Sequence, residues 1–418
     1  MPEGWAWCRL KHVCTMAAGK AKPTDQIMTE PFEGCYPCFG GNGIRGYVDE
    51  YNQDGIFSIV GRQGALCGNI NIAKGKFYAT EHAVVTTLFS GIDFNWSNYV
   101  LEALQLNSYA TGAAQPGLSV ANVLNVFVPV PPTQEQVHIG IRIAESIKII
   151  ENIEDEKENL QTLISSAKSK ILDLAIRGKL VPQDPNDEPA SVLLDRIQSE
   201  KEELIKAGKI KRDKKESVIF KGEDNSYYQQ TGTLIENIND WNLDDIPINW
   251  ELCCLGEICD YGNCVNVDTK DIDEEAWVLD LEDIEKDSGK VIHKIRKYER
   301  NSSSTKHLFK KGQVLYSKLR PYLNKVVLAD EEGFCTSEIL PLNFSNVVEP
   351  QYALYYLMSP TFLKYANRCS YGVKMPRLGT ADGRKAVFPL PPFEEQRRIS
   401  QHISKIFMEI DDISNMLI

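Results

Sequence analysis

The chain has 418 residues, of which 43% are hydrophobic and 25% are charged, and its formal net charge is −12. This length and composition predict two or three globular domains. They argue against a membrane-spanning protein, because no apolar run approaches the roughly 18 residues that a span needs. The N-terminal sequence MPEGWAWCRL also lacks the basic and apolar regions of a secretory signal. We therefore expect a cytoplasmic protein with no membrane partner.

The eleven cysteines are an odd number, which in a chain of this kind favours reduced thiols over a disulfide framework. Cys35-Tyr-Pro-Cys38 is a C-x-x-C pair without a second pair at zinc-finger spacing, and the loose cluster from Cys253 to Cys264 has no histidine nearby. Small buried thiols explain this pattern better than metal ligands do. The sequence thus predicts no metal site.

The first segment, residues 1 to about 130, is rich in glycine and alternates in polarity, which is typical of strands bounded by turns. Within it, residues 39–43 have the pattern F-x-G-x-G, which is found in loops that hold a cofactor such as S-adenosylmethionine. Asn42-Gly43 is equally a strong signal for a hairpin turn, and Arg45 beside it could reach a phosphate or a base edge. Taken alone, this segment leaves both interpretations open.

The chain repeats itself. PGLSVANVLNVFVPVPPTQEQVHIGIRI, around residue 130, aligns without a gap with PRLGTADGRKAVFPLPPFEEQRRISQHI, around residue 390, so that Pro116 corresponds to Pro376. PEGWAWCRL at residues 2–10 likewise corresponds to PINWELCCL at 247–255. This duplication predicts two similar domains, each followed by the same kind of helix.

Each repeat ends in a long helix that opens at P-P-x-x-E-Q, where the prolines end a strand and Glu and Gln favour a first helical turn. We expect the first helix from about Gln134 to Gly178 and the second from about Glu394 to Ile418. Apolar residues in both recur at alternating steps of four and three, the spacing of a heptad seam, so we expect the two helices to pair. The expected interface residues are Ile150, Ile153, Leu160, Ile164 and Ile171 on the first helix, and Ile399, Ile403, Ile406, Ile410 and Ile413 on the second.

The segment between the repeats, residues 181–245, is expected to contain a turn, a charged helix in SVLLDRIQSEKEELIKAGKIKRDKK and a loop in GEDNSYYQQTG. In the second repeat, GQVLYSKLRPYLNKVVLAD has the alternation of strands. Short helices are expected in WSNYVLEALQL in the first repeat and in PQYALYYLMSPTFLKYA in the second.

The negative net charge by itself argues against nucleic acid, since phosphate binding requires Lys and Arg. However, residues 290–325 hold eleven Lys or Arg and one acid, whereas residues 268–287 hold ten acids and two lysines. A basic stretch with aromatic residues in an acidic chain indicates a localised anion-binding face. Salt bridges between the two stretches are an equally weighted alternative.

Motifs of catalysis are missing from the sequence. There is no Asn/Asp-Pro-Pro-aromatic loop to grip a flipped base, and no P-loop, G-x-S-x-G or H-E-x-x-H motif. The six histidines are scattered. We therefore expect a protein without an active site, and keep a self-contained S-adenosylmethionine-dependent DNA methyltransferase, based on F-x-G-x-G, as the alternative.

Several motifs occur together and in order: P-L-P-P-x-x-E-Q-x-x-I from Pro389 to Ile399, its copy from Pro129 to Ile139, P-E-G-W near the start, and LDLAIRGKLVPQDPNDEPASVLL at residues 172–194. With these motifs, essentially the whole chain resembles the specificity subunit of type I restriction-modification enzymes. The resemblance implies an α+β fold with two similar mixed α/β target-recognition domains, joined by long helices that form an antiparallel coiled coil.

On this resemblance, the chain divides into five segments: recognition domain 1 (1–133), a central coiled-coil helix (134–180), a helical excursion and linker (181–245), recognition domain 2 (246–393) and a short distal coiled-coil helix (394–418). Each recognition domain would read one half of a split site in double-stranded DNA. The coiled coil would set the gap and dock two modification subunits, with restriction subunits joining through the complex. S-adenosylmethionine, ATP and Mg²⁺ are expected in partner subunits only.

The candidate DNA-binding residues are polar side chains near glycine turns or in the basic stretch. Arginine and lysine can pair with guanine, and asparagine and glutamine with adenine; phosphate contacts position the protein without reading sequence. In the first domain the candidates are Asn42, Arg45, Arg62, Gln63 and Gln115. In the second they are Lys318, Arg320, Tyr322, Lys325, Lys374 and Arg377, with Lys306, Lys310 and Lys311 expected at phosphates.

Overall fold

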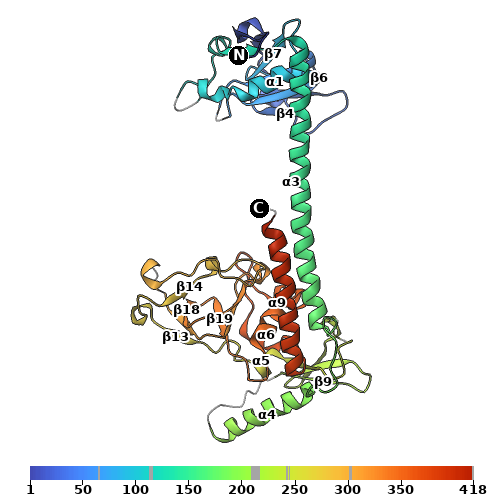
Figure 1. The fold of residues 1–418 in the computed structure, drawn as a ribbon, viewed down its shortest axis with the longest axis vertical. Coiled ribbons are helices and arrows are strands. Elements are labelled where there is room, and N and C mark those ends of the chain that lie inside the picture. Colours follow the sequence, from blue (N-terminus) through green and yellow to red (C-terminus); the bar gives the residue numbers. More distant parts are fainter. Residues whose placement is uncertain are drawn as a thin grey trace. The chain divides into compact units, whose positions relative to one another are not determined.

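The computed structural model describes residues 1–64, 66–112, 116–208, 217–241, 243, 245–300 and 304–416. The chain forms two units, residues 1–156 and 157–418. The long helix α3 (Thr133–Ile176) begins in the first unit and ends in the second (Figure 1). Each unit is described by itself below.

The first unit is built around a six-stranded sheet in the order β2-β7-β5-β6-β3-β4. The helix α1 (Phe94–Ala103) and the short helix α2 (Val120–Val123) accompany it, and a separate antiparallel pair joins β1 (Ala6–Arg9) to β8 (Phe127–Val130). The six strands are β2 (Cys14–Ala18), β3 (Tyr36–Gly40), β4 (Gly43–Val48), β5 (Gln53–Gly61), β6 (Ile70–Ala79) and β7 (Ala83–Leu88). Leu10, Trp96, Leu101 and Val128 are among the buried residues of its core.

The second unit has a four-stranded sheet in the order β13-β15-β18-β14 and a three-stranded sheet in the order β17-β16-β19. Its strands are β12 (Glu251–Cys254), β13 (Val265–Val267), β14 (Trp277–Leu279), β15 (Lys306–Phe309), β16 (Val314–Ser317), β17 (Val326–Leu328), β18 (Gly333–Thr336), β19 (Ile339–Leu342) and β20 (Val387–Leu390). Its helices are α5 (Leu255–Ile258), α6 (Pro350–Met358), α7 (Pro360–Cys369), α8 (Thr380–Lys385) and α9 (Phe393–Asn415).

The segment between the repeats contains more strand than the sequence predicts. The expected charged helix is α4 (Ala190–Lys206). It is followed by a three-stranded antiparallel sheet of β9 (Ser217–Lys221), β10 (Tyr227–Thr231) and β11 (Leu234–Asn237). The expectation of a loop in GEDNSYYQQTG is therefore wrong for Tyr227–Thr231. The strand-like pattern of YSKLRPYLNK is also misleading after Ser317, because a turn of 3₁₀ helix at Pro321–Leu323 follows.

The duplication predicted from the sequence is present in the structure at the level of single residue pairs. Strand β1 pairs with β8 from Ala6↔Val130 onward, and β12 pairs with β20 from Glu251↔Leu390 onward. These two pairs occupy corresponding positions in the sequence alignment of the repeats. The two strand pairs therefore have the same register.

A buried glutamine fixes the start of each long helix. In the second unit, Gln396 is fully buried, and its Nε2 donates to the carbonyl of Pro391 at 2.9 Å while its Oε1 accepts from the backbone N–H of Glu349 at 2.8 Å. In the first unit, Gln136 makes the same two bonds, each 2.9 Å long, to Pro131 and Asp93. Asp93 and Glu349 are the residues just before α1 and α6. The glutamine of P-P-x-x-E-Q thus joins three elements in each repeat.

Within the second unit, α9 runs antiparallel to the last part of α3 (Figure 1). Asp411 on α9 accepts hydrogen bonds from Lys168 on α3 and, at 2.5 Å, from Lys290. Burial would raise the pKa of the Asp411 carboxyl, but these two ammonium groups outweigh it and hold the pKa below its ordinary value. A cavity of about 760 Å³ also lies between the two helices, with Ile164 and Phe407 in its lining. Charged contacts therefore contribute to holding these helices together.

Only some of the residues predicted for the interface between the two long helices are buried in the described part of the chain. Ile150 and Ile153 are 54% and 58% exposed, and Ile413 is 52% exposed. Ile399 and Ile403 are fully buried, but they belong to the core of the second unit, which also includes residues of α6. Their burial therefore comes from the core of the unit as a whole, and not from contact between the two long helices alone. The remaining members, Leu160, Ile164, Ile171, Ile406 and Ile410, are partly buried.

We predict that Gln396→Met will destabilise the protein by about 3 kcal/mol. The substitution removes the partner of two buried carbonyls, on Pro391 and Val347, and of the partly buried N–H of Glu349, and each lost partner costs on the order of 1 kcal/mol. The free energy of unfolding from urea titration measures this effect. The matched control is Gln401→Met, an exposed glutamine on the same helix, which should change stability by less than about 0.5 kcal/mol. Equal effects would contradict the role of Gln396.

Candidate nucleic-acid interface

A short hairpin, residues 371–377, projects from the second unit at the start of the repeated sequence. Its ends are closed by two backbone hydrogen bonds between Tyr371 and Arg377, 3.1 and 2.9 Å long. The backbone N–H of Arg320 donates to the carbonyl of Pro376 at 2.7 Å, and Leu378 donates to the carbonyl of Lys318 at 3.0 Å. The hairpin is therefore braced against the turn that follows β16.

The first unit has the same arrangement at the corresponding place, in residues 111–117. Thr111 and Gly117 exchange two hydrogen bonds of 2.9 Å. Gly64 donates to the carbonyl of Pro116 at 3.0 Å, and Leu118 donates to the carbonyl of Arg62 at 2.8 Å. We call residues 371–377, and the segment between Thr111 and Gly117 of which residues 111–112 and 116–117 are described, the braced hairpins. Each unit thus presents one braced hairpin beside one turn, and the predicted residues Arg62 and Gln63 are brought to that turn.

Gly64 and Arg320 occupy equivalent positions and share an unusual backbone conformation. Their φ angles are 92° and 50°. Glycine adopts such a conformation without cost, but for arginine it is strained by about 1 kcal/mol or more. Such strain is commonly found at functional sites. The Nε of Arg320 is buried and has no hydrogen-bond partner among the described residues, so no acceptor there explains why an arginine stands at this position.

The tip of the second braced hairpin carries apolar side chains that point to solvent. Val373 at the tip is fully exposed, Met375 beside it is about half exposed, and Tyr371 at the end of the hairpin is 63% exposed. Tyr322, on the neighbouring turn, is exposed as well. The sequence reasoning missed Tyr371, Val373 and Met375, although their place beside the predicted Lys374 was a usable signal. Clustered exposed apolar side chains of this kind mark binding surfaces.

Several predicted cations are free to meet a ligand. Within the described residues, no side-chain hydrogen bond or ion pair engages Lys310, Lys311, Lys318 or Lys374, and all are at least partly exposed. Arg62 and Gln63 in the first unit are likewise exposed and without side-chain partners there. The side chains of Lys318, Arg320 and Lys374 belong to the braced hairpin and its turn. They form the basic part of the candidate interface.

Other predicted residues are engaged inside the protein. Lys306 is only 2% exposed and pairs with Asp280 at 3.1 Å, so this geometry argues against the expected phosphate contact. Lys325 donates to the carbonyl of Leu281 at 2.7 Å. The guanidinium of Arg377 forms a two-pronged pair with Glu338, with its Nε and Nη2 3.0 and 2.9 Å from the carboxylate oxygens. Lys325 and Arg377 are therefore explained by support of the fold.

The first-unit candidates near the glycine turn are partly engaged. Asn42 accepts from Asn69 at 2.8 Å, and Arg45 donates to Thr24 at 2.9 Å, yet both stay exposed. Gln115 lies outside the described residues. The braced hairpin of the first unit is therefore described only at its base.

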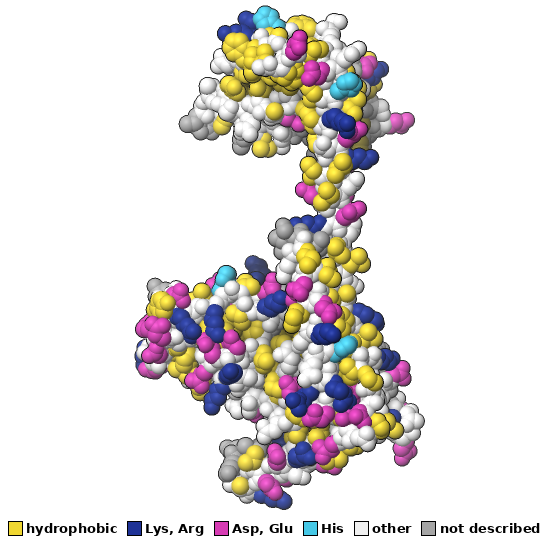
Figure 2. Space-filling view, viewed as in Figure 1, with side chains coloured by type: hydrophobic (Ala, Val, Ile, Leu, Met, Phe, Trp, Pro, Cys, Tyr) yellow, Lys and Arg dark blue, Asp and Glu magenta, His cyan; other side chains and the backbone are white. Residues whose placement is uncertain are grey.

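Much of the basic stretch is neutralised by acids, as the salt-bridge alternative expected. Arg300 pairs with Asp280, Glu282 and Asp283, and Lys297 pairs with Glu274. Lys294 and Arg296 pair with Glu331. In Figure 2, Lys and Arg side chains accordingly alternate with Asp and Glu over the lobe that contains β13 to β19. The cations whose side chains make no hydrogen bond or ion pair among the described residues lie in the later part of the basic stretch, from Lys310 to Arg320.

The F-x-G-x-G segment forms a hairpin between antiparallel strands. Gly40 of β3 is paired with Gly43 of β4, and Gly41 and Asn42 make the connection. A Cβ on the neighbouring Gly61 would lie 2.0 Å from the carbonyl oxygen of Gly41, so these backbones approach closely. The glycines are thus explained by turn geometry and packing. The strand-to-helix turn that usually cradles a nucleotide cofactor is a different arrangement.

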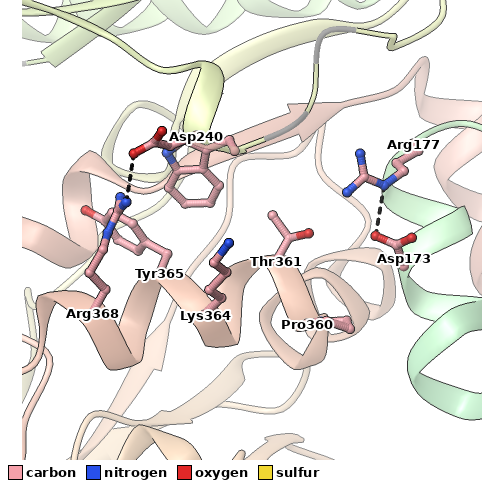
Figure 3. Close-up of a pocket in the computed structure, with 9 residues that line it drawn as sticks. Asp173, Arg177, Asp240, Pro360, Thr361, Lys364, Tyr365 and Arg368 are labelled. Carbon is pink, nitrogen blue, oxygen red and sulfur yellow. Dashed lines mark hydrogen bonds and ion pairs between the residues drawn. The ribbon is translucent and has the colours of Figure 1, made fainter. Parts of the chain in front are cut away.

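A separate cavity of about 230 Å³ lies where the end of α3 meets α7 (Figure 3). Two ion pairs line it: Asp173 with Arg177 at 2.8 Å, and Asp240 with Arg368 at 3.1 Å. Lys364 adds a further cation. The charges of this cavity are largely paired, which suits a structural role.

The cysteines behave as buried or half-buried thiols. All eleven are free, and burial raises the pKa of Cys14 to about 12 and that of Cys253 well above its ordinary value. Among the described residues, no three His, Cys, Asp or Glu side chains gather in a way that could hold a metal ion. Likewise, none of the helices in the described ranges has the length and apolar character to cross a membrane.

Comparison with known proteins gives a consistent family assignment. A family model for the type I restriction modification DNA specificity domain matches residues 2–162 and again residues 247–417. The specificity subunit of the Escherichia coli type I restriction enzyme EcoprrI is 46% identical over 31% of this chain, which covers 33% of that relative. The EcoDI specificity subunit, also from E. coli, is 21% identical over the whole chain, which covers 84% of that relative.

A third relative, the E. coli EcoAI specificity subunit, is 30% identical over 60% of this chain. The chain spans only 33% and 40% of the EcoprrI and EcoAI subunits. A chain in a solved structure of the type I R-M system, concerned with its complex assembly and conformational transition, aligns over the whole chain with a TM-score of 0.56 and 16% identity. At this identity the likeness shows a shared fold.

We predict that Arg377→Met will loosen the second braced hairpin. The two-pronged pair with Glu338 is lost, and a partly exposed pair of this kind is worth up to about 1 kcal/mol, so exchange of the Tyr371 and Arg377 backbone amides should become about fivefold faster. Hydrogen exchange measures this. In the control Arg368→Met, which removes the exposed pair with Asp240, exchange at these amides should stay unchanged. Unchanged exchange in Arg377→Met would show that the backbone bonds alone hold the hairpin.

Proposed function

Because the chain belongs to the family of type I restriction-modification DNA specificity proteins, we propose that it selects the DNA sequence on which a modification and restriction complex acts. In this function the chain itself is not an enzyme. Each unit reads one half of a bipartite site in double-stranded DNA. The observation that carries the proposal is the pair of braced hairpins, one in each unit, held by equivalent backbone bonds at equivalent places.

The side chains around the second braced hairpin suit a DNA groove. Lys318, Arg320 and Lys374 supply the donors that guanine accepts in the major groove. Val373 and Met375 are apolar and exposed, as a contact with the methyl group of thymine requires. In the first unit, the proposal gives the same role to Arg62 for guanine and to Gln63 for adenine. Bases are therefore read at a loop whose ends are held by backbone bonds to the fold.

Phosphate contacts are assigned to a different set of residues. Lys310 and Lys311 are exposed at the turn between β15 and β16 and have no side-chain partner among the described residues. They hold the backbone of the duplex and add salt-dependent affinity without reading sequence. The acidic surface elsewhere repels DNA and restricts the productive orientation.

The long helices α3 and α9 set the separation of the two half-sites and dock modification subunits. Support for docking comes from the exposed isoleucines of α3, Ile150 and Ile153, which offer apolar contact area. Methylation, with its S-adenosylmethionine, belongs to those modification subunits, and DNA cleavage, with its ATP and Mg²⁺, belongs to restriction subunits. These activities and partners are part of the proposal.

The proposal predicts a bipartite methylation motif. The chain is expressed in a bacterium without DNA methylation, alone and with a modification subunit from its own genome, and modified bases are mapped. A split motif with an unspecified gap should appear only when the modification subunit is present. A motif with the chain alone would contradict the proposal and favour an intrinsic methyltransferase.

Arg320→Asn is expected to weaken binding of that DNA by about tenfold, as loss of a base contact does. Asparagine tolerates the left-handed backbone at this position, so the substitution removes the guanidinium without refolding the turn. The dissociation constant is measured by fluorescence anisotropy at fixed salt. The control Lys221→Ala, on the segment between the repeats, should change it less than about twofold. Equal effects would remove Arg320 from the interface.

A further inference from the structure

The two repeats differ in what covers their paired strands. In the second unit, one face of β12–β20 is closed: Leu252 is 5% exposed and Val387 is fully buried. The segment between the repeats covers this face. Gln229 on β10 donates to the carbonyl of Lys385 at 2.8 Å and to the sulfur of Cys254 at 3.0 Å. Ala190, at the start of α4, donates to the carbonyl of Asn249 at 3.0 Å.

The corresponding face of the first unit is open. Trp7 stands at the position of Leu252 and is 57% exposed, and Phe127 stands at the position of Val387 and is 55% exposed. Arg9 lies over the Phe127 ring, 4.6 Å from its centre. Two large aromatic side chains therefore face solvent where the second unit has a buried interface. Burial of such side chains is the main source of energy in protein association.

A hydrogen-bonding site beside this face is also incomplete. In the second unit, Trp250 Nε1 donates to Glu395 at 3.0 Å, and the side chain of Gln183 donates to the same carboxylate at 2.6 Å. In the first unit the equivalent indole nitrogen, on Trp5, is buried without a partner among the described residues. An unpaired buried donor costs free energy, and the equivalent carboxylate, on Glu135, has no hydrogen-bond partner among them either. Only an acceptor can relieve this cost. In the second unit that acceptor is Glu395, which Gln183 also contacts, so an amide donor that binds Glu135 in the same way would hold its carboxylate where it accepts from Trp5.

A third contact in the second unit indicates which charge a segment that covers the open face of the first unit should carry. In the second unit, Arg398 makes a two-pronged ion pair with Asp187, with distances of 3.1 and 2.5 Å. His138 stands at the position of Arg398 and is exposed. A carboxylate on the cover would accept a hydrogen bond from the His138 ring. Val137 and Ile141 are also exposed, whereas their counterparts Arg397 and Gln401 are polar, so the start of α3 offers extra apolar area.

We propose that the open face of the first unit, formed by Trp5, Trp7, Phe127, Glu135 and His138, binds a polypeptide segment of a partner protein that is built like residues 178–206 of this chain. Such a segment carries an amide donor for Glu135, a carboxylate for His138, and apolar side chains for Trp7 and Phe127, as Ala190, Leu193 and Ile197 share one core with Leu252 and Val387. A second copy of this chain is a poorer occupant, because its own segment is already buried against its second unit: Ala190 and Leu193 are at most 1% exposed.

The probe is a synthetic fluorescent peptide with the sequence of residues 172–208, added to the full chain. Anisotropy should report saturable binding, and Trp7→Glu and Phe127→Glu should each weaken it by about tenfold or more, as loss of a central aromatic contact does. Both side chains are exposed, so the variants retain the fold, and thermal unfolding checks this. Ile56→Glu is the control, because Ile56 is a similarly exposed apolar residue on β5 of the same unit; it should bind like the unaltered chain.

Two outcomes would overturn the proposal. Absence of binding at millimolar peptide, or equal binding by the Trp7→Glu and Ile56→Glu variants, would show that the open face does not recognise such a segment. Light scattering of the chain without peptide gives the second test. A dimer that Trp7→Glu dissociates would assign the face to a second copy and not to a partner protein.

Discussion

A buried glutamine at the start of each long helix is the interaction on which the arrangement of each unit depends. Gln136 and Gln396 each connect the end of a strand, the first turn of a long helix and the N-terminus of a domain helix. An amide side chain can accept and donate at once, which no apolar residue of the same size can do. The direction in which each helix leaves its domain is thereby fixed by short, directional bonds in a dry environment.

The duplication, the helices and the turn at Asn42 could be predicted because they rest on local patterns. The register of β1 with β8 and of β12 with β20 follows from the repeat alignment. The strand at Tyr227–Thr231 could not be predicted, because its two tyrosines and two glutamines give no alternation and its stability comes from pairing with β9 and β11. The prediction that all these isoleucines form one helix–helix interface was too simple. The same spacing occurs in the domain core at Ile399 and Ile403 and on a solvent-exposed stripe at Ile150 and Ile153.

The candidate site was predicted in part. Charge counting identifies where cations are dense, but not which of them are neutralised, because acids distant in sequence, such as Glu331 and Glu338, decide that. Thus Lys306 and Arg377 are engaged within the fold, while Lys318 and Lys374 are free. The apolar tip of the second braced hairpin escaped notice because exposed valine and methionine look like ordinary core residues in a sequence. Their exposure in the folded chain shows that they face solvent.

In the second braced hairpin, the residues that hold the loop in place are different from the residues at its tip. All the backbone bonds that hold the second one involve its ends, Tyr371, Pro376 and Arg377, and the turn beside it, whereas Val373 and Lys374 at the tip make no contact that the fold requires. Substitutions at the tip therefore leave the free energy of folding almost unchanged while they alter the surface that the loop presents. A scaffold of this kind is open to evolutionary change at little cost, because single mutations at the tip of the second braced hairpin can alter the surface it presents while the bonds at its ends are kept.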